Sequence, residues 1–156
     1  MSSSPITNVF LDSEVARIVV LGIPDVPGHA AKLFSALAEN RAYAEMIIQN
    51  NMGGSVNDIG FLVKKPQLDA AMQVCRAYCR EVGAQGVSFD TEIARVTVSG
   101  NDLSASPEVP SRMFGVLAEK GINIEMIAST SQSVTCVVGA ARAADAVFAL
   151  EAHFID

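Results

Sequence analysis

The chain has 156 residues, of which half are hydrophobic and 18% are charged, so its composition predicts a globular protein rather than a disordered one. A formal net charge of −6, with no long run of Lys or Arg, argues against non-specific binding to nucleic acid or to an anionic membrane surface. The three cysteines, and the lack of a membrane-spanning apolar stretch or signal-like N-terminus, lead us to expect a cytoplasmic protein without disulfides.

Strand and helix signals alternate through the first half of the chain. β-Branched runs indicate buried strands, and apolar residues at helical spacing indicate two amphipathic helices. Pro27 suits the first position of one helix, and Gly83 ends the other. The predicted elements are strand 16–21, helix 27–40, strands 44–49 and 59–63, helix 66–82 and strand 87–89. This order, βαββαβ, predicts a ferredoxin-like domain.

The second half repeats the first. Residues 16–20 (ARIVV) return at 94–98 (ARVTV), and 45–47 (EMI) return at 125–127, also as EMI. Two copies with so long a period indicate a duplicated domain rather than a solenoid. The predicted elements are strand 94–99, helix 107–120 with Ser106 as its N-cap, strands 122–128 and 133–138, and helix 141–153.

The second copy lacks a closing strand after its last helix. Residues 6–11 (ITNVFL) are strand-like and otherwise unassigned, so we expect them to complete the second sheet; the alternative is a frayed extension. The expected domains are residues 13–92, inserted, and residues 1–12 together with 93–156. The predicted fold class is therefore α+β, with two ferredoxin-like domains, each an antiparallel four-stranded sheet with two helices on one face.

The turn at 22–31 (GIPDVPGHAA) is the most informative candidate site. It places a carboxylate, Asp25, before a helix start with small residues, where unpaired N–H groups attract an anion such as an α-carboxylate. Gln49, at the end of the next strand, offers both a donor and an acceptor. These groups would suit a zwitterion. The alternative is a Pro/Gly turn in which Asp25 caps its own backbone.

No constellation of catalytic residues stands out. The residues that we assign to core, helix-end or solvent-facing roles are Cys75, Cys79, Cys136, His153, Glu45 and Glu125. The spacing of the histidines and cysteines does not suit a metal site. We therefore expect no catalytic residue, no metal and no cofactor in this chain.

Four segments carry a resemblance to a known family. They are 23–38 (IPDVPGHAAKLFSALA), 45–50 (EMIIQN), 107–114 (PEVPSRMF) and 121–127 (GINIEMI). In order and content they resemble the tandem ACT regulatory region of aspartate kinases, over about residues 6 to 155. The resemblance implies two ACT domains, the first inserted in the second, in a separate β-type regulatory subunit or an excised regulatory domain.

The resemblance also implies a ligand and partners. Effectors in this family bind at ACT–ACT interfaces, often between two chains, which implies a homodimer, a small amino-acid effector and an aspartate kinase catalytic subunit or domain. By residue matching, the threonine-type effector contacts are Asp25, Gly28, His29, Ala30, Ala31, Gln49, Asn123 and Ile124. A second set of candidate contacts is Ser129, Thr130 and Ser131.

Two departures from the family pattern bear on the effector. Ser131 stands where many lysine-responsive members carry Glu, so lysine is less expected than threonine. Residues 40–44 (NRAYA) replace the usual Gly-Ile-Asn-Val, and Tyr43 is expected to alter the pocket or the dimer contact. The alternatives are a free-standing amino-acid-binding module that serves another enzyme or a transporter, and a dimerising scaffold that binds no ligand.

Overall fold

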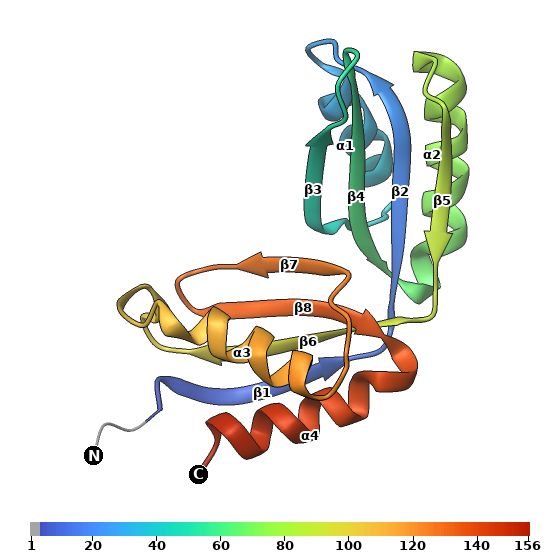
Figure 1. Ribbon diagram of the computed structural model, residues 1–156. Coiled ribbons are helices and arrows are strands. Elements are labelled where there is room, and N and C mark those ends of the chain that lie inside the picture. Colours follow the sequence, from blue (N-terminus) through green and yellow to red (C-terminus); the bar gives the residue numbers. More distant parts are fainter. Residues whose placement is uncertain (1–3) are drawn as a thin grey trace. The chain divides into compact units, whose positions relative to one another are not determined.

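The computed structural model describes residues 4–156, which divide into two compact units (Figure 1). We call Glu14–Thr91 the central unit, and residues 4–13 with 92–156 the flanking unit. Each unit is a four-stranded antiparallel sheet with two helices packed against one face, which confirms the predicted fold class. Within the described residues, no helix combines the length and the apolar character that crossing a membrane requires.

The central unit is built on strands that follow the order β3-β4-β2-β5. The strands are β2 (Val15–Pro24), β3 (Glu45–Asn51), β4 (Val56–Lys64) and β5 (Gly86–Asp90), and the helices are α1 (His29–Glu39) and α2 (Leu68–Val82). The core lies between the sheet and the helices. Ile18, Leu33, Phe61 and Cys75 are fully buried there. Alternate residues of β2 and β4 face the helices, because side chains in a strand alternate between the two faces.

The two helices of the central unit start later than predicted. Gly28 adopts a left-handed conformation (φ 95°), so α1 begins at His29 and Pro27 lies in the preceding turn. A 3-10 turn over Lys65–Gln67 contains Pro66, and α2 follows it. Gly83 ends α2 in a left-handed conformation (φ 74°), as predicted.

The flanking unit repeats this plan with the strand order β1-β6-β8-β7. The strands are β1 (Ile6–Asp12), β6 (Ile93–Gly100), β7 (Met126–Ser129) and β8 (Ser133–Gly139), and the helices are α3 (Glu108–Glu119) and α4 (Ala143–Phe154). β1 pairs antiparallel with β6 and takes the edge that β5 occupies in the central unit. An ion pair between Asp12 and Arg95, at 2.8 Å, joins these strands, as Arg17–Asp90 at 3.4 Å joins β2 to β5.

Two predictions in the flanking unit are wrong in detail. The strand predicted from 122 begins only at Met126, because Ile122 closes the end of α3: its N–H donates to the Leu117 carbonyl at 3.0 Å. Ser106 does not cap α3 with its side chain. Pro107 holds the N-cap position, and the Ser106 carbonyl accepts the N–H of Val109 at 3.1 Å instead.

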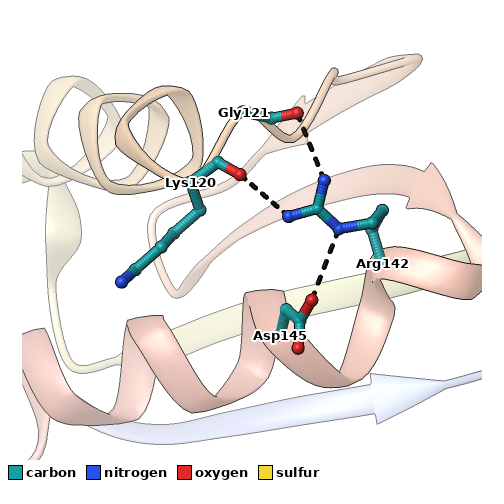
Figure 2. A network of polar contacts seen from close by, with 4 residues as sticks. All are labelled: Lys120, Gly121, Arg142 and Asp145. Carbon is teal, nitrogen blue, oxygen red and sulfur yellow. Dashed lines mark hydrogen bonds and ion pairs between the residues drawn. The ribbon is translucent and has the colours of Figure 1, made fainter.

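A charged side chain holds the other end of α3 (Figure 2). Arg142 donates to the Lys120 carbonyl at 2.8 Å and to the Gly121 carbonyl at 3.5 Å, and pairs with Asp145 at 3.4 Å. The last carbonyls of a helix lack partners within it and carry partial negative charge. The guanidinium therefore stabilises the C-terminus of α3 and ties it to the start of α4.

Candidate functional site

The β2–α1 turn and the end of the β3–β4 hairpin enclose a hollow of about 230 Å³ in the central unit. Five of the predicted contacts lie together in its lining, beside a buried polar residue that we did not predict, Asn57; the five are Asp25, Gly28, His29, Ala30 and Gln49. The hollow is small. Its size suits a metabolite such as an amino acid better than a drug-sized ligand.

The backbone holds the turn against the hairpin. The N–H of Asp25 donates to the Ser55 carbonyl at 2.8 Å, which fastens the turn to the tip of the hairpin. Among the described residues, no N-cap side chain accepts the first N–H groups of α1, because the cap position is Gly28. The N–H groups of Ala30 and Ala31 are thus in the first turn of an uncapped helix, where partial positive charge favours an anion.

Asp25 is exposed, and its carboxylate is fixed by Asn57 from β4. Asn57 Nδ2 donates to Asp25 Oδ1 at 3.0 Å. Asn57 is only 6% exposed. Sequence analysis missed this residue, although a signal was present: it shares one face of β4 with the buried Ile59 and Phe61, and is the one polar member of that series.

His29 connects the hollow to α2. Its Nδ1 lies 2.9 Å from the Pro24 carbonyl, which favours the tautomer with a proton on Nδ1. Its own carbonyl accepts the hydroxyl of Tyr78 at 2.9 Å. Burial raises the pKa of Tyr78 from 10.0 to about 12, so this hydroxyl stays protonated and can donate at neutral pH. Tyr78 was also missed, because nothing in the sequence marks a contact across 49 positions.

The remaining predicted contacts lie elsewhere. Ala31 is exposed on α1, outside the lining of the hollow. Asn123 and Ile124 belong to the flanking unit, in the segment before β7; Asn123 is exposed, and Ile124 packs against the core of that unit. Tyr43, 70% exposed, lines a separate apolar groove and not the hollow.

The flanking unit has a hollow at the corresponding corner, of about 400 Å³. The second set of candidate contacts, Ser129 to Ser131, lies there beside Pro107 and Pro110. The tip of this hairpin forms hydrogen bonds within itself: Thr130 Oγ1 accepts the N–H groups of Gln132 and Ser133, both at 3.1 Å. The first turn of α3 also contains an acidic residue, Glu108, whereas the first turn of α1 has none.

The buried cysteines have the structural roles that we predicted. Cys75 and Cys136 are fully buried, and Cys79 is 8% exposed. Burial raises the pKa of both Cys75 and Cys136 from 9.0 to about 12. Such thiols remain protonated at neutral pH and are poor nucleophiles. Glu125 is exposed, as expected, whereas Glu45 is partly buried.

Comparisons with known proteins agree on one family. A family model described as the ACT domain matches residues 17–77 and 96–154. An aspartokinase from Thermus thermophilus is 38% identical over 151 residues, which make up 96% of this chain and 37% of that protein. The chain thus spans little more than a third of the length of this relative.

Two solved structures are similar over nearly the whole chain. The ligand-free regulatory subunit of aspartate kinase from Thermus thermophilus has a TM-score of 0.90 at 37% identity, covering 97% of this chain and 99% of that chain. A structure of aspartokinase alpha and beta subunits has a TM-score of 0.88 at 28% identity, covering 96% of this chain and 98% of that chain. These matches confirm the family resemblance predicted from the motifs.

Proposed function

Because this chain belongs to the ACT-domain family and matches the regulatory subunit of aspartate kinase along its length, we propose that it senses a small amino acid on behalf of an aspartate kinase. The observation that carries the proposal is the hollow of the central unit. There, a fixed carboxylate, the uncapped start of α1 and the amide of Gln49 lie around one small volume. Its physiological setting would be feedback control of aspartate-family biosynthesis in the cytoplasm.

The chemistry of the hollow matches the groups of an amino acid. Asp25 would receive the ammonium, and the N–H groups at the start of α1 would receive the carboxylate. Gln49 would then bind a polar side chain, since its amide can both donate and accept. Asp25 is the one acidic residue in the lining, so a lysine side chain would find no second carboxylate there. This favours a threonine-type effector over lysine.

Regulation requires that the effector favour one state of the assembly. We propose that the effector binds where ACT domains meet in a homodimer, with Asn123 and Ile124 as further contacts. A ligand held between two chains has different affinities for two quaternary states, and that difference is the source of allosteric coupling. Couplings of this kind are typically about 1–3 kcal/mol, enough to change the activity of a catalytic subunit roughly tenfold.

A thermal-shift and calorimetry series tests the proposal. The protein is titrated with L-threonine, L-lysine, L-serine, L-methionine and L-isoleucine. A ligand at 100 times its dissociation constant stabilises the native state by about 2.7 kcal/mol, so the effector should raise the melting temperature clearly. Asp25→Ala should abolish the response without unfolding the protein. Glu151→Ala, an exposed acidic position on α4, is the matched control and should respond like the wild type.

The outcomes separate the candidate functions. If no amino acid raises the melting temperature, the sensor proposal is wrong and the scaffold alternative gains support. If an amino acid binds but the protein forms no complex with an aspartate kinase catalytic subunit, a free-standing binding module is favoured. A full response in Asp25→Ala would mean that the effector binds elsewhere.

A further inference from the structure

The side-chain amide of Asn57 contains a hydrogen-bond acceptor without a partner among the described residues. Its side-chain carbonyl, Oδ1, is buried and has no hydrogen-bond partner within the part of the chain that the structure describes. Buried polar atoms in native proteins are hydrogen-bonded in the large majority of cases. An unpaired buried atom has lost its hydrogen bonds to water and has formed none within the protein, which destabilises the fold. The residue also occupies a core-facing position of β4, where Leu or Val would be expected.

The orientation of the amide follows from its neighbour. Nδ2 lies 3.0 Å from Asp25 Oδ1, so the donor end of the amide faces the carboxylate. Turning the amide over would bring two oxygens together and leave the NH₂ group unpaired. Oδ1 is therefore the acceptor, in a side chain that lines the same hollow as Asp25 and Gln49.

We propose that Asn57 is a specificity-determining residue of this hollow, whose Oδ1 accepts a hydrogen bond from the effector's ammonium while its Nδ2 holds Asp25 ready for the same ammonium. The inference rests on the proposed function and deepens it. An ammonium carries three donors and no acceptor, so it can serve the carboxylate and the amide oxygen at once, which a single hydroxyl cannot. The site therefore selects ligands whose ammonium offers at least two N–H donors.

The central unit alone has this arrangement among the described residues. At the corresponding hairpin of the flanking unit, Thr130 Oγ1 already accepts two backbone N–H groups. No buried side-chain acceptor without a partner is found there among the described residues. We therefore expect one amine-selective site per chain.

Two substitutions separate recognition from structural support. Asn57→Leu keeps the branched shape of the side chain, with a larger volume and no polar atom, so it removes both the unpaired oxygen and the N–H group that holds Asp25. The free protein should stay folded and melt close to the wild-type temperature, because loss of the unpaired buried oxygen offsets the tighter packing, while the dissociation constant for L-threonine rises at least about tenfold. Asn57→Asp keeps an acceptor in place, and a proton shared with Asp25 would replace the lost N–H. It should bind L-threonine within about threefold of the wild type.

The ligand provides a test that does not depend on any variant folding. 3-Hydroxybutyrate keeps the carboxylate and hydroxyl of threonine but has no ammonium, so it should bind the wild-type protein at least about 100-fold more weakly. Equal binding of the two compounds would overturn the inference. So would normal L-threonine binding by a folded Asn57→Leu, or a marked loss of melting temperature in that variant with wild-type affinity retained. If L-threonine does not bind the wild type, the threonine-type function itself fails, and the inference with it.

Discussion

The same corner of the fold is built twice in this chain, and the two versions differ in what they leave open. In the central unit, α1 starts after a glycine with no acidic residue in its first turn, and Asp25 is held beside it by Asn57. In the flanking unit, Glu108 already places a carboxylate in the first turn of α3, and Thr130 closes the hairpin. The start of α1 is open to an anion from outside the chain, whereas the start of α3 already has the carboxylate of Glu108.

This difference shows where a duplicated domain can diverge. The cores of both units keep buried apolar residues at matching strand and helix positions, because a change there would leave cavities or clashes. At the corner, Asp25 and Gln49 are exposed, so such residues can change without loss of the fold. Likeness between the copies therefore indicates the fold, and unlikeness at the corner marks where we propose that a ligand binds.

The largest effect is expected from making the central corner resemble the flanking one. Ala30→Glu would place a carboxylate at the start of α1, as Glu108 does for α3. Because it occupies the anion position and repels the ligand's carboxylate, the dissociation constant for L-threonine should rise about 100-fold, or about 2.7 kcal/mol. Isothermal titration calorimetry measures this. Ser35→Glu, at an exposed position further along α1 and outside the lining of the hollow, is the control; an equal loss there would argue against a local cause.

Alkaline pH should destabilise the central unit more than the flanking unit. Burial raises the pKa of Cys75 and Cys136 from 9.0 to about 12, and that of Tyr78 from 10.0 to about 12. Burial also raises the pKa of Cys79. The unfolded chain loses the cysteine protons above about pH 9 and the tyrosine proton above about pH 10, while the folded chain keeps them, so stability falls as pH rises towards 12. The slope approaches about 1.4 kcal/mol per pH unit for each fully buried thiol.

The two tyrosines make this effect measurable, because Tyr43 and Tyr78 both belong to the central unit. Urea unfolding followed by tyrosine fluorescence should show a falling midpoint between pH 8.5 and 10. Cys136→Ala should leave that slope unchanged, since the residue lies in the flanking unit. A midpoint that stays constant over this range would contradict the prediction.

A smaller, stabilising effect is expected at the end of α1. Arg41 adopts a left-handed conformation (φ 57°), whereas Gly121 holds the corresponding place after α3 (φ 68°). Side chains are strained in this conformation and glycine is not, so Arg41→Gly should stabilise the central unit by about 1 kcal/mol. Thermal unfolding measures the gain. Gly121→Arg is the mirror experiment and should cost the flanking unit a similar amount; a loss in Arg41→Gly would mean that the arginine makes a stabilising contact.

The fold was predictable because its signals are local and occur twice. Alternating apolar residues in β2 and helical spacing in α1 act within a few positions, and the repeat at 94–98 supports the first assignment. The errors lie at element ends. Ile122 resembles the start of a strand but packs over the end of α3, and Pro27 resembles a helix start, yet Gly28 turns the chain first.

The lining of the hollow was predictable within one turn of the chain and at Gln49, which lies near the end of the next strand. Asp25, Gly28 and Ala30 lie in one turn, so a motif can group them. Asn57 reaches Asp25 from 32 positions away, and Tyr78 reaches His29 from 49 positions away. Such pairs depend on the pairing of strands and the packing of helices. A polar residue in an otherwise apolar strand face is the only trace that Asn57 leaves in the sequence.

The strand β1 has a consequence for how the protein is made. It leaves the ribosome before the central unit, yet its partner β6 follows it, with Asp12 and Arg95 separated by 83 positions. At translation rates of roughly 5–20 residues per second, this strand waits several seconds for its neighbour while the central unit already has all of its own elements. Synthesis order thus lets the central unit fold first and makes the pairing of β1 with β6 a later step.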